Sequence, residues 1–174
     1  KDLLNNYLEK DINGRENRRK TINILMRTWV NVEDEHKAVR KEALEIFNET
    51  SEKGKLALNW CMLTLAYPIF FDICTVIGNL FELSNEFSSS MIKRRIFEKW
   101  GERSTLEYAI GKIISSIRDW GIIEQGKKYG YYKKNEKIDS IDKDIQVLFL
   151  KTYLISSQKN CIDYANVEHI PALF

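Results

Sequence analysis

The hydrophobic positions of the chain recur mostly at helical spacing. Apolar side chains at i, i+3, i+4 and i+7 predict helices over residues 16–30 and 32–53, the second of which is expected to end at Gly54. Two strongly apolar stretches, 55–66 and 68–83, predict a pair of buried helices. Pro68 suits the first turn of the later one, because its fixed φ is already helical. These four helices are expected to form a scaffold.

A different pattern follows from residue 88 to residue 121. Three serines at 88–90 precede a predicted helix that ends at Trp100 and Gly101. After a short turn, Ser104 and Glu107 have the spacing of a capping box, which predicts the start of another helix. The apolar residues of this helix share one side, and they are Leu106, Ala109, Ile110, Ile113, Ile114 and Ile117.

The stretch 122–134 has the pattern of a β-hairpin. Apolar and aromatic residues flank a basic turn that is bounded by Gly126 and Gly130. Helix, tight turn, helix and basic hairpin, in this order, are typical of a winged helix-turn-helix. Helical spacing returns over 141–157.

The predicted fold is therefore mainly α, a helical bundle with one winged helix-turn-helix and a small β-hairpin wing. We divide the chain into three parts on this basis. Residues 1–87 form a helical scaffold, 88–137 the winged helix-turn-helix, and 138–174 a C-terminal helix and tail that pack on the core.

The charge distribution adds a functional hint to this fold. The 174 residues are 44% hydrophobic and 30% charged, which is typical of a folded globular protein and not of a disordered one. Net charge is only +2, but residues 88–137 carry 12 basic and 6 acidic side chains, while each flanking part has a net charge of −2. A basic excess within the predicted winged helix favours nucleic acid as the partner.

The geometry of a winged helix indicates which residues would touch duplex DNA. Its second helix enters the major groove and its hairpin lies against the phosphates. The predicted contacts on the two helices are Arg94, Arg95, Arg103, Ser104, Thr105, Tyr108, Lys112 and Ser115, and those on the wing are Lys127, Lys128, Tyr129, Lys133 and Lys134. A second basic patch of Arg15, Arg18, Arg19 and Lys20 extends this footprint, or is a solvated face or a partner surface.

Candidate catalytic chemistry is sparse. The two histidines, His36 and His169, have no second histidine or cysteine at metal-ligand spacing, and His36 is expected at the surface. Glu35 and Lys37 form the Glu-x-Lys pair of some nucleases, but those place it on a strand and here it lies in a helical stretch. Asp72, in an apolar segment, is interpreted as a hydrogen-bonded or partly exposed helix residue and not as a catalyst. We therefore expect no enzyme activity, metal, cofactor or small-molecule substrate.

The cysteines and the apolar runs bear on location. Cys61, Cys74 and Cys161 are odd in number and widely spaced, so all three are expected to be reduced and structural, which favours the cytoplasm. The charged start of the sequence predicts no secretory leader. The longest uncharged run, from Leu56 to Phe71, is shorter than the roughly 20 residues of a membrane-spanning helix, so no membrane is expected as partner.

Several motifs are spread along the chain, at residues 58–60, 66–68 and 71–72, at 96–101 and 104–105, at 116–123, and at the closing 171–174. Together they resemble the BrxA family of bacterial BREX phage-defence systems. This resemblance covers most of the chain in the same order. It implies a small helical DNA-binding protein without enzymatic activity, which acts beside larger defence components.

The sequence thus predicts a non-enzymatic protein that binds double-stranded DNA, largely through phosphates and with modest sequence preference. Other defence-system proteins are further expected partners. Two alternatives stay open. One is a protein–protein adaptor that docks through the winged helix, and the other is a dimeric transcriptional repressor on a palindromic site.

Overall fold

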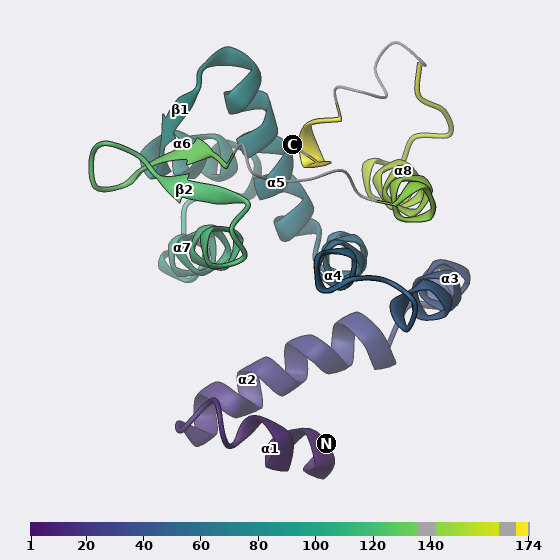
Figure 1. The fold of residues 1–174 in the computed structure, drawn as a ribbon. Coiled ribbons are helices and arrows are strands. Elements are labelled where there is room, and N and C mark those ends of the chain that lie inside the picture. The colour runs from purple at the N-terminus through teal and green to yellow at the C-terminus, as the bar shows by residue number, and fades with distance from the viewer. Residues whose placement is uncertain (136–141, 164–169, 174) are drawn as a thin grey trace.

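The computed structural model describes residues 1–135, 142–163 and 170–173, and it is mainly α-helical with one small antiparallel sheet (Figure 1). Its helices are α1 (Asp2–Leu8), α2 (Arg15–Leu25), the π-helix η1 (Met26–Val30), the 3-10 helix η2 (Asp34–His36), α3 (Lys37–Phe47), α4 (Glu52–Ala66), α5 (Pro68–Leu83), α6 (Ser89–Trp100), α7 (Ser104–Asp119), α8 (Lys143–Ser157) and the 3-10 helix η4 (Pro171–Leu173). Its strands are β1 (Glu86–Ser88), β2 (Ile123–Gln125) and β3 (Tyr131–Lys134). The predicted mainly α class is confirmed.

The helix predicted over 32–53 is shorter than expected. It ends as α3 at Phe47, and a new helix, α4, begins after Ser51, whose hydroxyl accepts a hydrogen bond from the Gly54 amide at 3.2 Å. Gly54 therefore lies inside α4 and does not end a helix. A Cβ at this position would lie 1.8 Å from Oγ1 of Thr50, so the glycine lets the preceding turn pack against α4.

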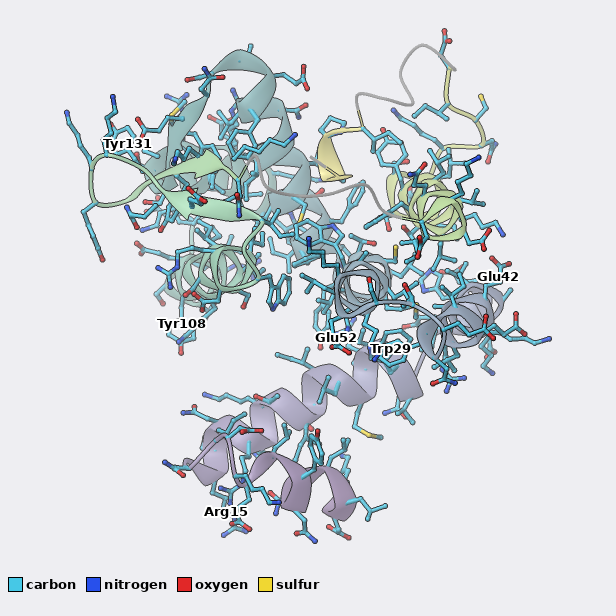
Figure 2. The ribbon with its side chains drawn as sticks, viewed as in Figure 1. Arg15, Trp29, Glu42, Glu52, Tyr108 and Tyr131 are labelled. Atoms are coloured by element: carbon cyan, nitrogen blue, oxygen red, sulfur yellow. The ribbon has the colours of Figure 1, made fainter. Side chains whose placement is uncertain are left out.

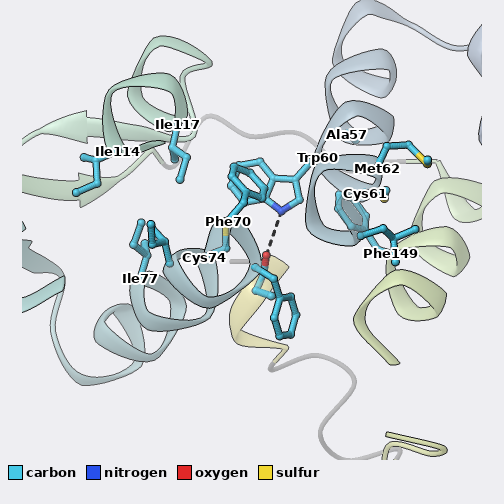
Figure 3. Close-up of a cluster of buried hydrophobic side chains, with 14 of the residues drawn as sticks. Ala57, Trp60, Cys61, Met62, Phe70, Cys74, Ile77, Ile114, Ile117 and Phe149 are labelled. Atoms are coloured by element: carbon cyan, nitrogen blue, oxygen red, sulfur yellow. Dashed lines mark hydrogen bonds between the residues drawn. The ribbon is translucent and has the colours of Figure 1, made fainter. Parts of the chain in front are cut away.

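Helix α5 is the centre of the core. It begins at Pro68 as predicted and contacts α4, β1, α6, α7 and η4. Figure 3 shows Ile77 of α5 beside Ile114 and Ile117 of α7, and all three side chains are buried. The division predicted at residue 87 stays a prediction, and the helix before it packs against the elements after it.

The C-terminal segment packs against the same helix. Gly78 of α5 leaves room for the backbone of Pro171, because a Cβ there would lie 1.8 Å from the Pro171 carbonyl oxygen. The indole Nε1 of Trp60 donates a hydrogen bond to the Ala172 carbonyl oxygen at 3.2 Å (Figure 3). Helix α8 packs on α3 and α4 and buries Ile145 and Leu148.

The sheet has the strand order β1-β3-β2, with both pairings antiparallel. The β2–β3 hairpin confirms the sequence prediction, whereas β1 was not predicted. Phe87 of β1 is fully buried and pairs with Tyr132 of β3, and its ring lies 4.8 Å from the ring of Phe81 at an edge-on angle. The sheet is thereby fastened to the end of α5.

Helices α1 and α2 form an N-terminal arm that lies apart from the sheet (Figure 1). They pack against each other, and α2 continues into η1. Trp29 of η1 donates a hydrogen bond from Nε1 to Oδ1 of Asn59 on α4 at 2.8 Å. The arm is thus joined to the body of the protein through η1.

None of the described helices is by itself both long enough and apolar enough to cross a membrane. Only α4 and α5 taken together reach that length and composition, and they are bent by 116° at their junction. Many of their apolar side chains, among them Leu58 and Ile73, are buried within the protein.

Candidate nucleic-acid interface

The turn between α6 and α7 consists of residues 101–103. Gly101 ends α6 with a φ of 76°, in the left-handed region that glycine tolerates best. The predicted capping box is not formed, because α7 has Arg103 as its N-cap residue and no side chain caps it. Glu107 instead accepts a hydrogen bond from Nζ of Lys93 at 2.7 Å. This ion pair joins α6 to α7 and takes the carboxylate away from the helix start.

Helix α6 is also held against α5 by a buried carboxylate. Asp72 accepts hydrogen bonds from Nζ of Lys99 and from the indole Nε1 of Trp100, each at 2.7 Å. The side chain of Asp72 is buried, so the interpretation of this residue as a hydrogen-bonded helix position is confirmed. Its role is to orient α6.

The two sides of α7 have opposite character. Leu106, Ile110, Ile114 and Ile117 are buried, which confirms the predicted core side. On the opposite side, Tyr108 is 64% exposed and points away from the sheet (Figure 2). We call this opposite side, formed by Thr105, Tyr108, Gly111, Lys112 and Ser115, the outer face of α7.

The outer face is small, polar and nearly uncharged. Thr105 and Lys112 are exposed, and a Cβ at Gly111 would meet nothing within 4 Å. The Lys112 ammonium lies 5.4 Å from the ring centroid of Tyr108. These features leave the middle of the outer face accessible, so that a binding partner could lie close to the helix there.

The far end of the outer face is electrostatically balanced. Arg118 forms an ion pair with Asp119 at 2.8 Å and donates a hydrogen bond to the Ser115 hydroxyl at 3.2 Å. Asp119 is therefore not an unpaired negative charge. Ser115 is only half-exposed and already has a partner.

The hairpin loop, residues 126–130, is fixed by two side chains. The Gln125 amide donates hydrogen bonds to the carbonyl oxygens of Lys128 at 2.9 Å and Tyr131 at 3.0 Å. From β1, Oε1 of Glu86 accepts a hydrogen bond from the Lys127 amide at 2.9 Å. Sequence reasoning missed both residues. Gln125 could have been found from its position, because it is a polar residue directly before the glycine-bounded turn, but no local signal pointed to Glu86.

The hairpin presents its cations to solvent. Lys127, Lys128 and Lys134 are exposed and Tyr129 is fully exposed. Lys133 forms an ion pair with Glu124 at 3.1 Å. Across the ranges that the structure describes, the other three lysines have no ion pair. The predicted wing residues therefore lie on one hairpin, with Lys127, Lys128 and Tyr129 in its loop and Lys133 and Lys134 on β3, opposite the start of β2.

The remaining predicted contacts lie around the turn between the helices. Arg94 is exposed on α6, and Arg95 is half-buried there. Arg103 is exposed and donates a hydrogen bond to the Trp100 carbonyl oxygen at 3.3 Å. Ser104 and Thr105 are exposed in the first turn of α7.

The second basic patch is only partly available. Arg18 is buried, and its guanidinium binds Oδ1 of Asn5, the carbonyl oxygens of Ile12 and Asn13, and Glu9 at 3.2 Å. The prediction of Arg18 as a surface contact is therefore wrong, because the α1–α2 turn uses this side chain to satisfy its own carbonyl groups. Arg15, labelled at the end of the arm in Figure 2, Arg19 and Lys20 are exposed. Arg19 is paired with Glu16 at 2.6 Å.

Among the titratable residues outside this region, one further prediction is corrected. His36 is buried, so the prediction of a surface position is wrong, while His169 lies outside the described residues. Burial raises the pKa of the Cys61 thiol to about 12 and that of Cys74 well above its ordinary value. Cys161 is free and exposed, so a structural role fits only the other two cysteines. Within 1–135, 142–163 and 170–173, no three histidine, cysteine or acidic side chains are grouped to hold a metal ion.

Comparisons with known proteins identified no relative of this chain. The chain matches no protein-family model, no curated protein and no solved structure. The resemblance to BrxA proteins stays a prediction, and the functional argument rests on the residues described above.

Proposed function

We propose that α5, α6, α7 and the three strands form a winged helix-turn-helix that binds duplex DNA. In this proposal α7 lies in the major groove and the hairpin loop lies against the phosphates. One observation carries it. The exposed outer face of α7 is followed, after strand β2, by a loop that side-chain hydrogen bonds hold in place and whose Lys127 and Lys128 have no ion pair within the described part of the chain.

The arrangement of the helices supports a groove-binding mode. Two helices joined by a three-residue turn with glycine are typical of a helix-turn-helix, and the major groove is wide enough for one helix. The outer face of α7 has only one central cation, Lys112, and Gly111 leaves room for close approach. Few side chains on it read bases, so the sequence preference is expected to be modest.

The start of α7 supports a phosphate contact. Because no side chain caps this helix, its first amide groups are available to an anion. Arg103 is exposed beside them, and Ser104 and Thr105 can donate hydroxyl hydrogen bonds. Backbone contacts from this end and from the wing lysines would supply most of the affinity.

Fluorescence anisotropy with a labelled duplex of about two helical turns tests the proposal. The test variant replaces the four wing lysines, Lys127, Lys128, Lys133 and Lys134, by alanine. A control variant replaces Lys37, Lys41, Lys143 and Lys159, which are exposed on α3, at the start of α8 and after α8. Each variant loses four positive charges, so a general charge effect would appear in both. We expect the wing variant to bind at least tenfold more weakly and the control to bind like the parent. Equal affinity of the wing variant and the parent would show that the wing lysines do not contact the DNA.

Co-purification and footprinting, added to this experiment, separate the two alternatives. No binding to duplex at low salt, together with a protein partner that co-purifies, would favour an adaptor. Protection of two half-sites about one helical turn apart would favour a dimeric repressor.

The resemblance of several motifs to those of BrxA proteins is the reason for a narrower form of the proposal, in which the protein acts in phage defence. Phage plating on cells with and without the gene tests it. If phage restriction is lost when the gene is deleted, and the parent restores it but the wing variant does not, both the defence role and the function of the wing are supported. Unchanged plating would rule out the defence role and would not bear on DNA binding.

A further inference from the structure

The loop of the β2–β3 hairpin, residues 126–130, projects from the sheet (Figure 1). Tyr129 lies in this loop and is 100% exposed, and the next most exposed large apolar or aromatic side chain in the described ranges is Leu3 at 86%. Tyr129 therefore buries almost none of its surface against the part of the protein that the structure describes. Tyr132 of β3 differs, because its ring packs 6.0 Å from that of Phe87.

The backbone around Tyr129 is constrained on both sides. The Gly126 amide donates a hydrogen bond to the Tyr131 carbonyl oxygen at 2.7 Å, and the Tyr131 amide donates one to the Lys128 carbonyl oxygen at 3.1 Å. Gly130 has a φ of 78°, in the left-handed region that glycine tolerates best. The folded hairpin therefore presents the ring of Tyr129 to solvent on a loop that its own hydrogen bonds close.

Positive charge lies next to this ring. Lys127 and Lys128 directly precede it, and both are exposed and have no ion pair within the described ranges. The pKa of the Arg118 guanidinium is raised mainly by Asp119 and further by the nearby hairpin tyrosines, Tyr129 among them. The loop thus lies within electrostatic range of the end of α7, so a ligand of α7 can also reach the ring.

An exposed aromatic ring beside cations has the chemistry that unpaired nucleic-acid strands require. Proteins that bind such strands use positive charge for the backbone and aromatic rings on which bases stack. In an intact duplex the faces of the bases are covered by neighbouring base pairs, so a ring can enter only by unstacking them. An unpaired base has its face free and avoids most of this cost.

We propose that Tyr129 stacks on an unpaired base, so that the protein prefers duplex DNA with a short single-stranded segment beside the wing. This inference rests on the proposed function, in which α7 and the wing lysines hold the duplex. Lys127 and Lys128 lie against phosphates next to the unpaired base, and Tyr129 covers its face. Because every base has such a face, the preference is for structure and not for sequence.

Fluorescence anisotropy with three duplexes of the same paired length tests this preference. One is blunt, one has a short single-stranded extension, placed on either strand in turn, and one has an extension of the same length made of abasic nucleotides. The two extended duplexes carry the same phosphates, so they differ only in the bases available for stacking. We expect the parent to bind the base-bearing extension tighter than the abasic one by about fivefold or more, the effect of one stacked base.

Three variants assign this preference to Tyr129. Tyr129→Ala removes the ring and should bind the two extended duplexes equally, whereas Tyr129→Phe keeps the ring and should keep the preference. Tyr7→Ala is the matched control, because Tyr7 is 75% exposed on α1, outside the proposed interface. Since Tyr129 is fully exposed, its alanine variant should have the Tm of the parent. An unchanged preference in Tyr129→Ala would overturn the assignment.

The fluorescence of 2-aminopurine in the extension reads the contact directly, because stacking quenches the emission of this base. The parent, Tyr129→Phe and Tyr7→Ala should quench it on binding, and Tyr129→Ala should not. Equal weakening of all three duplexes by Tyr129→Ala would place the ring on paired DNA and would overturn the unpaired base as its partner.

Failure of this inference is distinguishable from failure of the proposed function. A parent that binds the blunt duplex but treats the two extended duplexes alike would overturn the inference and leave the proposed DNA binding intact. A parent that does not bind the blunt duplex would overturn the proposed function and, with it, this inference.

Discussion

The carboxylate of Asp72 accepts a hydrogen bond from the indole Nε1 of Trp100 at 2.7 Å. One residue lies in the first turns of α5 and the other is the last residue of α6, so this contact sets the position of α6 against the central helix. Lys99 adds a second donor to the same carboxylate at 2.7 Å. The turn that leads into α7 begins directly after this pair.

Asp72→Ala should destabilise the protein by about 2–3 kcal/mol, because it removes a charged acceptor and leaves the Trp100 donor unpaired. Asp72→Asn keeps one oxygen acceptor for the indole and should cost roughly half as much. Urea unfolding followed by circular dichroism measures both. Equal stability of the alanine variant and the parent would show that this contact does not hold α6.

Gly78→Ala should also destabilise the protein, by about 1–3 kcal/mol, because the added methyl group would overlap the Pro171 backbone and displace η4. Gly111→Ala is the matched control, since it lies inside a helix with nothing near its Cβ position. There the better helix propensity of alanine should stabilise the protein by about 1 kcal/mol. The two glycine variants should therefore move Tm in opposite directions, and a shift in the same direction would contradict the packing of η4 on α5.

Gly111 also offers a test of the outer face of α7. Gly111→Gln places a long side chain at the middle of this face, where free space surrounds the Cβ position. Stability should be retained, whereas affinity for duplex DNA should fall at least tenfold if α7 lies in the groove. Anisotropy titration together with a melting curve gives both readouts, and undiminished affinity would place the DNA elsewhere.

The thiols should differ in reactivity. Burial raises the pKa of Cys61 to about 12, against an ordinary value of 9.0, and also raises that of Cys74 well above 9.0, while Cys161 is exposed. Iodoacetamide at pH 8 should therefore label Cys161 alone in the folded protein and all three cysteines in urea, as read by mass spectrometry. Rapid labelling of Cys61 or Cys74 in the folded protein would contradict their burial.

The same shift has a consequence for stability at high pH. A thiol whose pKa is raised on folding binds its proton more tightly in the folded state. Its contribution is therefore complete below pH 9 and is lost as pH rises from about 9 toward 12. Unfolding by urea at several pH values in this range should show falling stability, and Cys61→Ala should reduce the slope of that fall.

The periodicity of apolar residues was sufficient to predict most of the helices. The stripe of isoleucines in α7 and the apolar runs of α4 and α5 each have a strong local pattern, and the structure places their apolar side chains in the core. Strand β1 has no such pattern. It has three residues, and its partner, β3, is more than forty residues away along the chain, so only the tertiary pairing of Phe87 with Tyr132 defines it.

The errors at single residues have a common cause. Arg18, His36 and Glu107 are polar residues that sequence reasoning assigned to the surface or to a helix cap. In the folded chain Arg18 binds the carbonyl groups of its own turn, His36 is buried beside η2, and Glu107 pairs with Lys93 of the neighbouring helix. Such partners are brought together by tertiary structure, and spacing along the chain does not reveal them.

The salt dependence of DNA affinity is the most direct test of the central proposal, that the wing lysines contact the phosphates of a duplex. The logarithm of the binding constant should fall linearly with the logarithm of the salt concentration, by about 0.9 for each phosphate contact. Lys133 already pairs with Glu124, so three free lysines are lost in the four-lysine wing variant, and its slope should be shallower than that of the parent by about 3. The control variant on α3, at the start of α8 and after α8 should keep the parent slope. A wing variant with the parent slope would contradict the account.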